Sequence, residues 1–386
     1  MPKDDLNYKF TENGLVYDFY DVFVPAENFR QPSLLGWGTN NLVQLGNNST
    51  TSPPTPVTTF AGGTTWKQVA CNSIATAAIK TDGTLWTWGQ SGGDGGGILG
   101  NNNGSNISVS TPITTFAGGN DWKQVSVATQ AAAIKTDGTL WVWGNGMDGG
   151  LGINNLAIFQ GSRKLTPVTT FAGGNNWKQV SCGGGITAAI KTDGSLWIWG
   201  YNNTGSCGTN DTLVKSTPVT TFAGGNDWKQ VSCSVGGHVG AIKTDGSLWT
   251  WGLGTSGQLG NFANTNRNTP VTTFAGGNTW KSVYAGDLTT GAIKTDGSLW
   301  VWGLGRYIGI NDATNKSTPV TTFSGGNNWK QICLENHTIA LKTDGTIWGT
   351  RNDFFTFTPS FSGSNSWKSI AVKGSTMLAI KYSPDP

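Results

Sequence analysis

Few side chains in this sequence are of the types that perform acid–base or metal chemistry. Only two histidines occur among its 386 residues, His238 and His337, and each lies five residues before a lysine that ends a short apolar segment. Two isolated histidines make neither a catalytic triad nor a zinc site. We expect both to be ordinary positions of a repeated segment, because other copies place a different residue there. Those residues are Ala75, Gln130, Ile186, Thr289 and Thr376.

The carboxylates and the glycine-rich stretches give no catalytic pattern either. The run Lys-Thr-Asp-Gly occurs six times, and its Asp-Gly pair predicts a hairpin in which both residues take the positive φ of a primed turn. A calcium loop requires several oxygen ligands at close spacing, whereas Asp94 stands alone between glycines. The triple glycine at 183–185 precedes an expected strand, while phosphate-binding loops open a helix. The sequence therefore predicts no catalytic residue, no metal, no cofactor and no enzyme activity.

The five cysteines form neither a disulfide framework nor a metal-binding pattern. Cys71, Cys182 and Cys233 each follow a Trp-Lys pair at the same distance, and other copies have valine, alanine or leucine there. A position that accepts these residues is a small buried apolar site. Free cysteines are typical of a reducing compartment such as the cytoplasm.

Tryptophan gives the clearest period in the chain. Trp-Gly pairs begin at Trp37, Trp88, Trp143, Trp199, Trp251, Trp302 and Trp348, and Trp-Lys pairs begin at Trp66, Trp122, Trp177, Trp228, Trp280, Trp329 and Trp367. Five further tryptophans complete a Leu-Trp-x-Trp-Gly pattern, so all 19 tryptophans belong to the repeat. A period of about 50 residues indicates a repeat architecture rather than a set of separate domains.

Each repeat contains four segments typical of short strands: Leu-Trp-x-Trp-Gly, Thr-Pro-Val-Thr-Thr-Phe, Trp-Lys-Gln-Val and Ala-Ala-Ile-Lys. Four-stranded sheets repeated seven times close radially, so we predict an all-β, seven-bladed β-propeller. No Leu-Trp-x-Trp-Gly segment follows the last Ile-Lys segment, and residues 34–38 resemble the missing one. We expect this N-terminal strand to complete the last blade, which removes two exposed sheet edges. The propeller is predicted to span residues 34–386, after a non-repeat arm at residues 1–33.

The combined motif resembles the repeat of the regulator-of-chromosome-condensation family. It is seen in Trp251-Gly252, Gly257-Gln258-Leu259-Gly260, Pro270-Val271, Trp280-Lys281 and the run from Ala292 to Gly297. The likeness covers about residues 34–383, with a degraded Gln-Leu-Gly element at 98–100, 206–208 and 307–309 and a shortened loop at 350–358. The resemblance implies a propeller scaffold, and members of this fold act as guanine-nucleotide exchange factors or as protein inhibitors of β-lactamase.

Lysine also recurs, at two positions of every repeat, and these account for 14 of the 25 basic residues. A ring of like charge could bind an anion or an acidic partner. We favour a solvated strand face, partly offset by the six turn aspartates. The net charge of +3 is small for this length and predicts no nucleic-acid partner. The sequence contains no run of 18 apolar residues, so we predict no membrane insertion. The first five residues lack the apolar segment of a signal peptide, so none is expected.

Connections between propeller strands alternate between the two faces of the disc. Two connections, Ala-Gly-Gly-Asn and Thr-Asp-Gly, are nearly the same in every copy, and we call their side the generic face. The other two differ in length and content, as at residues 90–110, 145–165, 201–216 and 253–268, and they define the variable face. Individual loops on a rigid scaffold are common recognition sites, although unconstrained drift also produces such variation. The predicted contact residues are Phe159, Arg163, Tyr201, Phe262, Arg267, Arg306, Tyr307, Phe354 and Phe355.

The N-terminal arm is rich in aromatic residues, whereas a disordered tail would be poor in them. Its aromatic residues are Tyr8, Phe10, Tyr17, Phe19, Tyr20, Phe23 and Phe29. Residues 16–24 have the pattern of an extended strand. We expect the arm either to pack on its own propeller or to dock on a partner by strand addition or as an anchor.

Three functions remain open at this point. The repeats are rich in Asn, Thr and Gly and poor in charge, and in this the chain is similar to propellers encoded by tailed, especially marine, bacteriophages. That similarity implies a non-enzymatic structural, adhesion or decoration component of a virion: a capsid, neck or tail appendage made in the host cytoplasm. The arm would then bind other virion proteins, and the variable loops a host-surface protein or glycan. The alternatives are a cytoplasmic protein-binding regulatory module, of the GTPase-regulator or enzyme-inhibitor type, and a carbohydrate-binding propeller.

Overall fold

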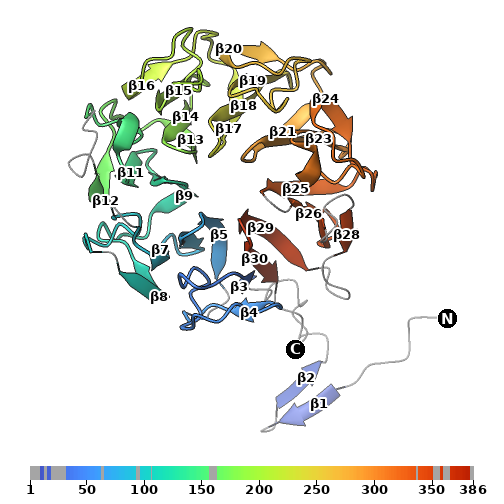
Figure 1. The fold of residues 1–386 in the computed structure, drawn as a ribbon. Helices are drawn as coiled ribbons and strands as arrows, with labels where there is room; N and C mark the ends of the chain where they lie inside the picture. The colour runs from blue at the N-terminus through green and yellow to red at the C-terminus, as the bar shows by residue number, and fades with distance from the viewer. Residues whose placement is uncertain are drawn as a thin grey trace, which may run out of the picture.

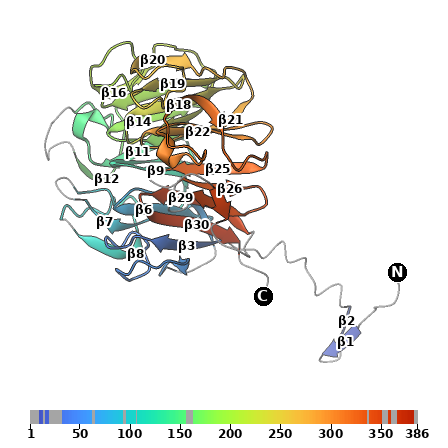
Figure 2. The same cartoon turned by 45° about the vertical axis from the view of Figure 1, so that its right-hand side comes forward.

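Seven four-stranded antiparallel sheets surround a common axis in the computed structural model (Figure 1), as the repeats predict. Figure 2 shows the same ring of sheets from an oblique angle. The structure describes residues 9–12, 15–18, 32–61, 65–92, 96–105, 107–155, 163–335, 338–350, 357–359 and 366–382. In each sheet the strands follow the chain from the axis outward, except where the two ends of the chain share one sheet.

The strands are grouped here by their distance from the axis. The innermost are β5 (Trp66–Cys71), β9 (Trp122–Val127), β13 (Trp177–Cys182), β17 (Trp228–Cys233), β21 (Trp280–Ala285), β25 (Trp329–Leu334) and β29 (Trp367–Lys373). The second are β6 (Ala75–Lys80), β10 (Gln130–Lys135), β14 (Ile186–Lys191), β18 (His238–Lys243), β22 (Thr289–Lys294), β26 (Thr338–Lys342) and β30 (Thr376–Tyr382). The third are β7 (Leu85–Gln90), β11 (Leu140–Gly144), β15 (Leu196–Gly200), β19 (Leu248–Gly252), β23 (Leu299–Gly303), β27 (Ile347–Thr350) and β3 (Pro32–Gly38). The outermost are β8 (Ser108–Thr114), β12 (Lys164–Thr169), β16 (Lys215–Thr220), β20 (Arg267–Thr272), β24 (Lys316–Thr321), β28 (Phe357–Pro359) and β4 (Val57–Thr58).

Among the described residues, three short elements lie outside these sheets. Two are the 3-10 turns η2 (Met147–Gly149) and η4 (Gly305–Tyr307). The third is a hairpin of β1 (Lys9–Glu12) and β2 (Leu15–Asp18), which forms a two-stranded sheet of its own. The predicted strand at residues 16–24 therefore overlaps β2, and the rest of that segment lies outside the described residues.

The ring is closed by one sheet that both ends of the chain share. Its order is β29-β30-β3-β4, and β3 pairs with β30 from Pro32 opposite Tyr382 to Gly38 opposite Thr376. The predicted closure by an N-terminal strand is confirmed. The N-terminal end contributes a second strand as well, because β4 forms the outer edge of the same sheet.

The sheet boundary falls inside the repeat as it appears in the sequence. Each complete sheet begins with the Trp-Lys strand at the axis and ends with the Thr-Pro-Val strand at the rim. The structure also corrects the assignment of Trp348 to the Trp-Gly set. Its indole donates to the Thr346 hydroxyl at 3.0 Å, as Trp86 does to Thr84 at 2.9 Å, so Trp348 occupies the first tryptophan position of its strand. Thr350 then stands where the other third strands carry their second tryptophan.

The Thr-Asp-Gly turns differ from the prediction. Gly83 has φ +83°, but Asp82 is not among the residues with positive φ, so a primed turn is wrong. Lys80 N–H bonds Thr84 O and Gly83 N–H bonds Lys80 O, which describes a three-residue loop ending in a glycine bulge. The Asp82 carboxylate stabilises this loop by accepting hydrogen bonds from Thr84, and they lower the pKa of that carboxyl.

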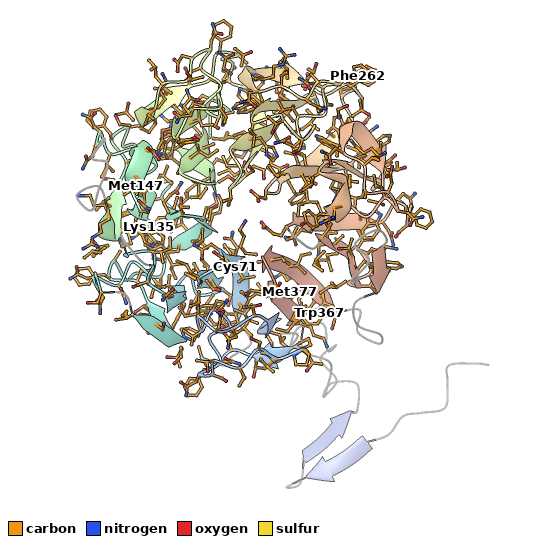
Figure 3. The ribbon with its side chains drawn as sticks, viewed as in Figure 1. Cys71, Lys135, Met147, Phe262, Trp367 and Met377 are labelled. Atoms are coloured by element: carbon orange, nitrogen blue, oxygen red, sulfur yellow. The ribbon has the colours of Figure 1, made fainter. Side chains whose placement is uncertain are left out.

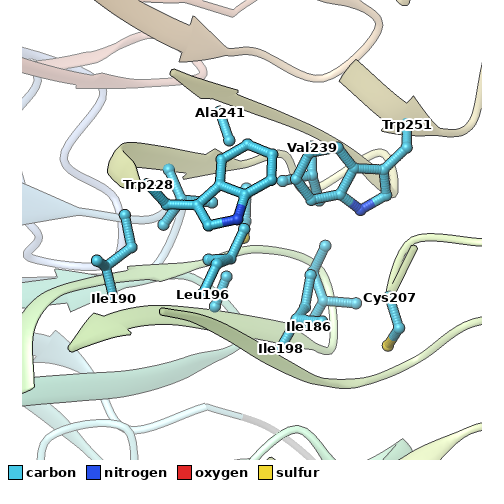
Figure 4. Close-up of a cluster of buried hydrophobic side chains, with 12 residues drawn as sticks. Ile186, Ile190, Leu196, Ile198, Cys207, Trp228, Val239, Ala241 and Trp251 are labelled. Atoms are coloured by element: carbon cyan, nitrogen blue, oxygen red, sulfur yellow. The ribbon is translucent and has the colours of Figure 1, made fainter. Parts of the chain in front are cut away.

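The core is divided into clusters that lie between neighbouring sheets. In one of them (Figure 4), Ile186, Leu196 and Ile198 of one sheet face Trp228 and Trp251 of the next. The innermost tryptophans are almost fully buried, and so are most of the second tryptophans of the third strands. Large aromatic side chains supply much apolar surface per residue, which compensates for the many glycines and alanines of these strands.

Each sheet is fastened to the next through the Gln-Leu-Gly element of the long outer loop. Trp88 Nε1 donates to Gln44 O at 2.8 Å, and Leu45, between Gln44 and Gly46, is buried in the same interface. Trp143, Trp199, Trp251 and Trp302 make the same bond to Ile98, Gly150, Ser206 and Gln258, at 2.8 to 3.0 Å. The accepting atom is a backbone carbonyl, so the degraded copies at 98–100 and 206–208 still make the contact. In the third, at 307–309, the Tyr307 carbonyl accepts from the Thr338 hydroxyl instead.

The innermost strands are joined to one another by glutamine side chains. Gln179 donates its amide to Val231 O at 2.9 Å and accepts Val231 N–H at 3.0 Å. The same pair of bonds is made by Gln68, Gln124, Gln230 and Gln331 to the next inner strand. These side chains complete the hydrogen bonding of strand edges that face the axis, where no further strand follows.

The lysines of the second strands are not the solvated face that we favoured from the sequence. Lys80 Nζ lies 5.0 Å from the ring centre of Trp66 and 4.5 Å from that of Trp86, and the residue is half-buried. Five further sheets hold a lysine between two tryptophans in this way. An ammonium over an indole face is a favourable cation–π contact, so this set of lysines is part of the framework.

Candidate functional site

The two faces of the disc are distinct in the structure. On the generic face the linker between sheets meets the Thr-Asp-Gly turn of the sheet before it, because Trp122 N–H bonds Gly83 O at 2.9 Å and the equivalent bond recurs around the ring. The variable face carries the loops that leave the innermost and third strands. We take this face as the candidate functional site, since its loops differ from sheet to sheet.

The variable face has a cavity of about 260 Å³ beside the first two complete sheets. Its lining includes Ile74, Ile98 and Met147 from these sheets, while Val235, in the loop after β17, and Lys373, at the end of β29, come from elsewhere in the ring. Met147 is 43 % and Val235 40 % exposed, so both side chains are open to solvent. Apolar side chains with one ammonium group form the kind of surface that a protein side chain or a small apolar group can occupy.

Lys373 is held at this face by Glu335. Their side chains lie 2.7 Å apart and are only 16 % and 14 % exposed, respectively. Burial raises the pKa of the Glu335 carboxyl, and the Lys373 charge acts in the opposite direction. A second cavity, of about 210 Å³, is lined by Glu335 together with Asp287 and Tyr307. The pair therefore places one positive and one negative group between two hollows of the variable face.

The structure separates the predicted loop residues into two groups. Tyr201 and Tyr307 line cavities of the variable face, and Arg306, next to Tyr307 in η4, is exposed. Phe262 lies at the rim (Figure 3), and Arg163 and Arg267 lie at or beside the start of outermost strands. Phe159, Phe354 and Phe355 lie outside the residues whose side chains the structure describes.

Of the seven aromatic residues of the arm, only Phe10 and Tyr17 lie on described strands. Phe10 and Tyr17 pair as opposite residues of the β1–β2 hairpin. Their side chains, and Tyr8, Phe19, Tyr20, Phe23 and Phe29 altogether, lie outside the described part of the chain, so the arm as a docking segment stays a prediction.

Sequence reasoning missed several residues that line the 260 Å³ cavity of the variable face. Ile74 and Val235 belong to the short hairpin loops between innermost and second strands, and Lys373 is the last residue of β29, directly before such a loop. These loops belong to the variable face, but they are short beside the long outer loops from which the contact residues were chosen. The pairing of Lys373 with Glu335 has no signal in the sequence, because the two residues come from different repeats.

His238 does not belong to this face. It is fully buried, and its Nε2 lies 2.9 Å from the Thr290 hydroxyl of the next sheet, while burial lowers its pKa to about 3. Gln130, at the equivalent position, bonds the equivalent Thr187 at 2.8 Å. His238 is thus a contact between sheets, as the repeat suggests, and His337 lies outside the described residues.

The cysteines are free thiols in the core or beside the axis. Cys182, Cys207 and Cys233 are buried, whereas Cys71 and Cys333 are half-buried and line an axial cavity of about 270 Å³. Figure 3 shows Cys71 on β5, close to the axis. Burial raises the pKa of every one of these thiols, to about 12 for Cys182, so they are poor nucleophiles.

Two other kinds of site have no counterpart among the described residues. These residues hold no group of three or more His, Cys, Asp or Glu side chains arranged to bind a metal ion. Within the same part of the chain, no helix has the length and apolar character needed to cross a membrane.

The repeat is matched by a known family model. A model described as "Regulator of chromosome condensation (RCC1) repeat" matches residues 33–79, 137–190, 193–242 and 245–293, which together are more than half of the chain. The chain belongs to the RCC1 repeat family. A second model of the same description matches residues 177–208.

Individual relatives share the repeats at moderate identity. The ultraviolet-B receptor UVR8 of Arabidopsis thaliana is 28% identical over 273 residues, 70% of this chain and 60% of the relative. The mitochondrial RCC1 domain-containing protein RUG3 of the same plant is 30% identical over 253 residues, 61% of this chain and 53% of the relative. The human E3 ubiquitin-protein ligase HERC2 is 26% identical over 287 residues, 71% of this chain and 6% of the ligase. The chain thus spans less than two thirds of each relative.

Solved structures agree with the fold. Human WBSCR16 superimposes with a TM-score of 0.75 at 17% identity, covering 92% of this chain and 100% of WBSCR16. Yeast RCC1 (Prp20), in its complex with Kap60, superimposes with a TM-score of 0.75 at 16% identity, covering 92% of this chain and 90% of Prp20. At these identities the likeness establishes the propeller fold alone.

Proposed function

We propose that this RCC1-repeat propeller is a non-enzymatic protein-binding module of the regulatory type, and that its variable face recognises the partner. The observation that carries the proposal is the contrast between the faces. One face is built from two turns that recur with nearly the same sequence, whereas the other carries individual loops around an apolar cavity and a largely buried Lys373–Glu335 pair. Recognition commonly resides in such loops on a rigid scaffold.

The solved neighbours support a protein as the ligand. Yeast RCC1 (Prp20) forms a complex with Kap60, and Prp20p of Saccharomyces cerevisiae also binds Gsp1p and histones. We transfer to this chain only the class of ligand, a protein. The individual partners of these neighbours are not part of the proposal.

The virion and carbohydrate-binding functions stand as weaker candidates. The first rests on the style of the repeats and on the aromatic arm, and none of the relatives named above is a bacteriophage protein. The second rests on the polar loops alone. Neither gains a specific observation from the site.

The proposal is tested by comparing capture of partners by matched variants. Met147→Asp and Val235→Asp place a charge in the cavity lining, and because both side chains are exposed we expect the fold to be kept. Ala223→Asp, in an exposed generic-face linker, is the control with the same change in charge. Proteins bound from a lysate of the producing cell are identified by mass spectrometry.

The expected result is one protein that the wild type and the control retain and that both cavity variants lose. Retention of the same partners by all four chains would overturn the assignment to this face. Proteins of a phage particle as the bound species would favour the virion function, and release by free sugar would favour the lectin.

A further inference from the structure

We propose that the generic face carries a second binding site, a collar of seven lysines around the axis that binds an acidic polypeptide tail. The collar consists of Lys67, Lys123, Lys178, Lys229, Lys281, Lys330 and Lys368. Each is the second residue of an innermost strand, and these strands begin on the generic face. The site lies on the face opposite the variable loops and does not depend on the function proposed for them.

The backbone explains why these lysines reach solvent while their neighbours are buried. In every innermost strand the pairing slips beside the tryptophan: Trp177 pairs with Lys191 and Gln179 with Ile190, so that Lys178 has no opposite residue. The same slip occurs in the other six sheets. A bulge of this kind re-aims a side chain. Six of the seven lysines are exposed and Lys368 is half-buried.

The collar lysines belong to strands that are close neighbours. Glutamine follows five of them and links that inner strand to the next, as Gln179 does to Val231. Lys330 Nζ reaches across to donate to Lys368 O at 2.8 Å. Burial, and next the charge of Lys368, lower the pKa of Lys330, as expected where ammonium groups are gathered. Like charges held by a rigid ring produce a positive potential at its centre.

The carboxylates of this face do not neutralise the collar. In the described part of the chain no collar lysine forms an ion pair, and Asp121 and Asp227 pair instead with Lys135 and Lys243, at 3.1 and 3.2 Å. The turn aspartates lie farther from the axis, between second and third strands, and each is bonded within its own turn, as Asp193 is to Ser195. Lys330 bonds the Lys368 carbonyl and Lys368 lies 5.6 Å from the Tyr382 ring centre, but neither contact neutralises the positive charge that the collar offers to a ligand.

This arrangement favours a narrow acidic chain over a nucleic-acid duplex. The charges are concentric, with lysines near the axis and the six turn aspartates around them. A stiff duplex lying across the face would pass over the acidic ring on both sides, whereas a flexible tail that approaches along the axis meets the lysines first. Lysine presents a single charged amine without the flat fork of arginine, and the neighbouring tryptophans are buried and unable to stack on bases.

The test uses the full chain and a fluorescein-labelled peptide of ten glutamates, with binding followed by fluorescence anisotropy. We expect saturable binding that weakens as salt is raised, because exposed charges are screened. The triple variant Lys123→Gln, Lys178→Gln, Lys229→Gln is expected to bind about tenfold or more weakly, and the triple Lys→Arg variant at the same positions to bind like the wild type.

Two controls make the outcome specific. The variant Lys164→Gln, Lys215→Gln, Lys316→Gln removes the same charge from outermost strands and should keep the wild-type affinity. Thermal unfolding monitors the fold of every variant. Wild-type affinity in the collar variant, or an equal loss in the outer-strand variant, would overturn the proposal. If a DNA duplex of equal charge binds more tightly than the glutamate peptide, the ligand of the collar is nucleic acid and the proposed acidic tail is wrong.

Discussion

A buried histidine makes the stability of this protein depend on pH. His238 lies fully buried between two sheets, where burial lowers its pKa from 6.5 to about 3 and so favours the neutral ring. In the unfolded chain the same ring gains a proton near its ordinary pKa. The unfolded state therefore binds more protons below pH 6.5, and stability falls as the pH falls.

We predict that the free energy of unfolding decreases by about 2 kcal/mol between pH 6.5 and pH 5, at about 1.4 kcal/mol per pH unit. The turn aspartates should contribute little in this window because their pKa values lie below 3.8. Urea unfolding at several pH values measures the effect. In His238→Gln, which copies the residue at Gln130, this part of the decrease should vanish, and an unchanged slope would contradict the assignment.

Phe262 is the one bulky residue at a backbone position that other repeats give to asparagine. Its φ is +67°, and the equivalent residues Asn48, Asn102, Asn154, Asn210 and Asn311 have φ between +57° and +63°. Asparagine tolerates this left-handed conformation far better than phenylalanine. Phe262 is also 71 % exposed, and its ring lies 5.4 Å from Phe274, which is 67 % exposed. The left-handed backbone costs stability, and the exposed ring makes little packing that could offset the cost.

Phe262→Asn should therefore raise the free energy of unfolding by about 1 kcal/mol, since it removes left-handed strain at the position of a mostly exposed side chain. The reverse change at an equivalent site, Asn210→Phe, should lower it by a similar amount. Both values come from urea unfolding curves. A less stable Phe262→Asn would mean that the contact with Phe274 outweighs the strain.

At the scale of elements, sheets are held together by backbone carbonyls and side-chain amides as well as by tryptophan packing. Gly152 shows how tight the outer contact is: a Cβ there would lie 2.7 Å from Trp199 Nε1, and φ is +63°. Gly173, in a generic-face linker, has φ +53° but nothing within 4 Å. Alanine substitutions at the two glycines therefore distinguish the cost of a left-handed backbone, present at both, from the cost of a steric clash, present only at Gly152.

Gly173→Ala should cost about 1 kcal/mol, from the left-handed backbone alone. Gly152→Ala should cost about 1–3 kcal/mol more, because the methyl group must displace the Trp199 ring or its hydrogen bond to Gly150. Thermal or urea unfolding gives both values. Equal costs would show that the outer loop moves aside freely.

The glutamine links of the inner strands provide a second test at this scale. Gln179→Met keeps the length of the side chain but removes both bonds to Val231, so it should lower the free energy of unfolding by about 1–3 kcal/mol. Ser369 holds the equivalent position of the closing sheet, and its buried hydroxyl has no hydrogen-bond partner among the residues that the structure describes. Ser369→Ala should accordingly be neutral or stabilising. A neutral Gln179→Met would assign the cohesion of the inner strands to packing alone.

At the scale of the molecule, the sequence predicts the architecture well because each strand carries its own marker. The tryptophan pairs establish the number of sheets, and residues 34–38 reveal the closure. The turn type was wrong because the Asp82 carboxylate favours a longer loop than Asp-Gly pairing suggests. Trp348 was assigned to the wrong position because its strand lacks the second tryptophan. The Gln-Leu-Gly element looked degraded because the contact it makes uses a backbone carbonyl, such as Ile98 O, which any residue can supply.

The candidate sites were harder to predict, for a geometrical reason. Ile74 and Lys373 line one cavity although about 300 residues separate them, and only closure of the ring brings them together. The recurring lysines indicated a possible ring of like charge, although we favoured a solvated strand face. The sequence does not show that the Trp-Lys strand is innermost, so it does not show which set of lysines forms the ring. The sequence also does not show that the second set of lysines is held between tryptophans, as Lys191 is, while the collar lysines are not.

The pairing of Pro32 with Tyr382 places the beginning and the end of the ring on adjacent strands. The order of the sheets is thus cyclic, and which of them comes first is a matter of where the gene starts. A chain reopened at another generic-face turn, with the present ends joined, would keep every contact between sheets and would differ only in which sheet its two ends share. For an engineer, any of these turns is then a point at which a second domain can be attached without disturbing the loops of the opposite face.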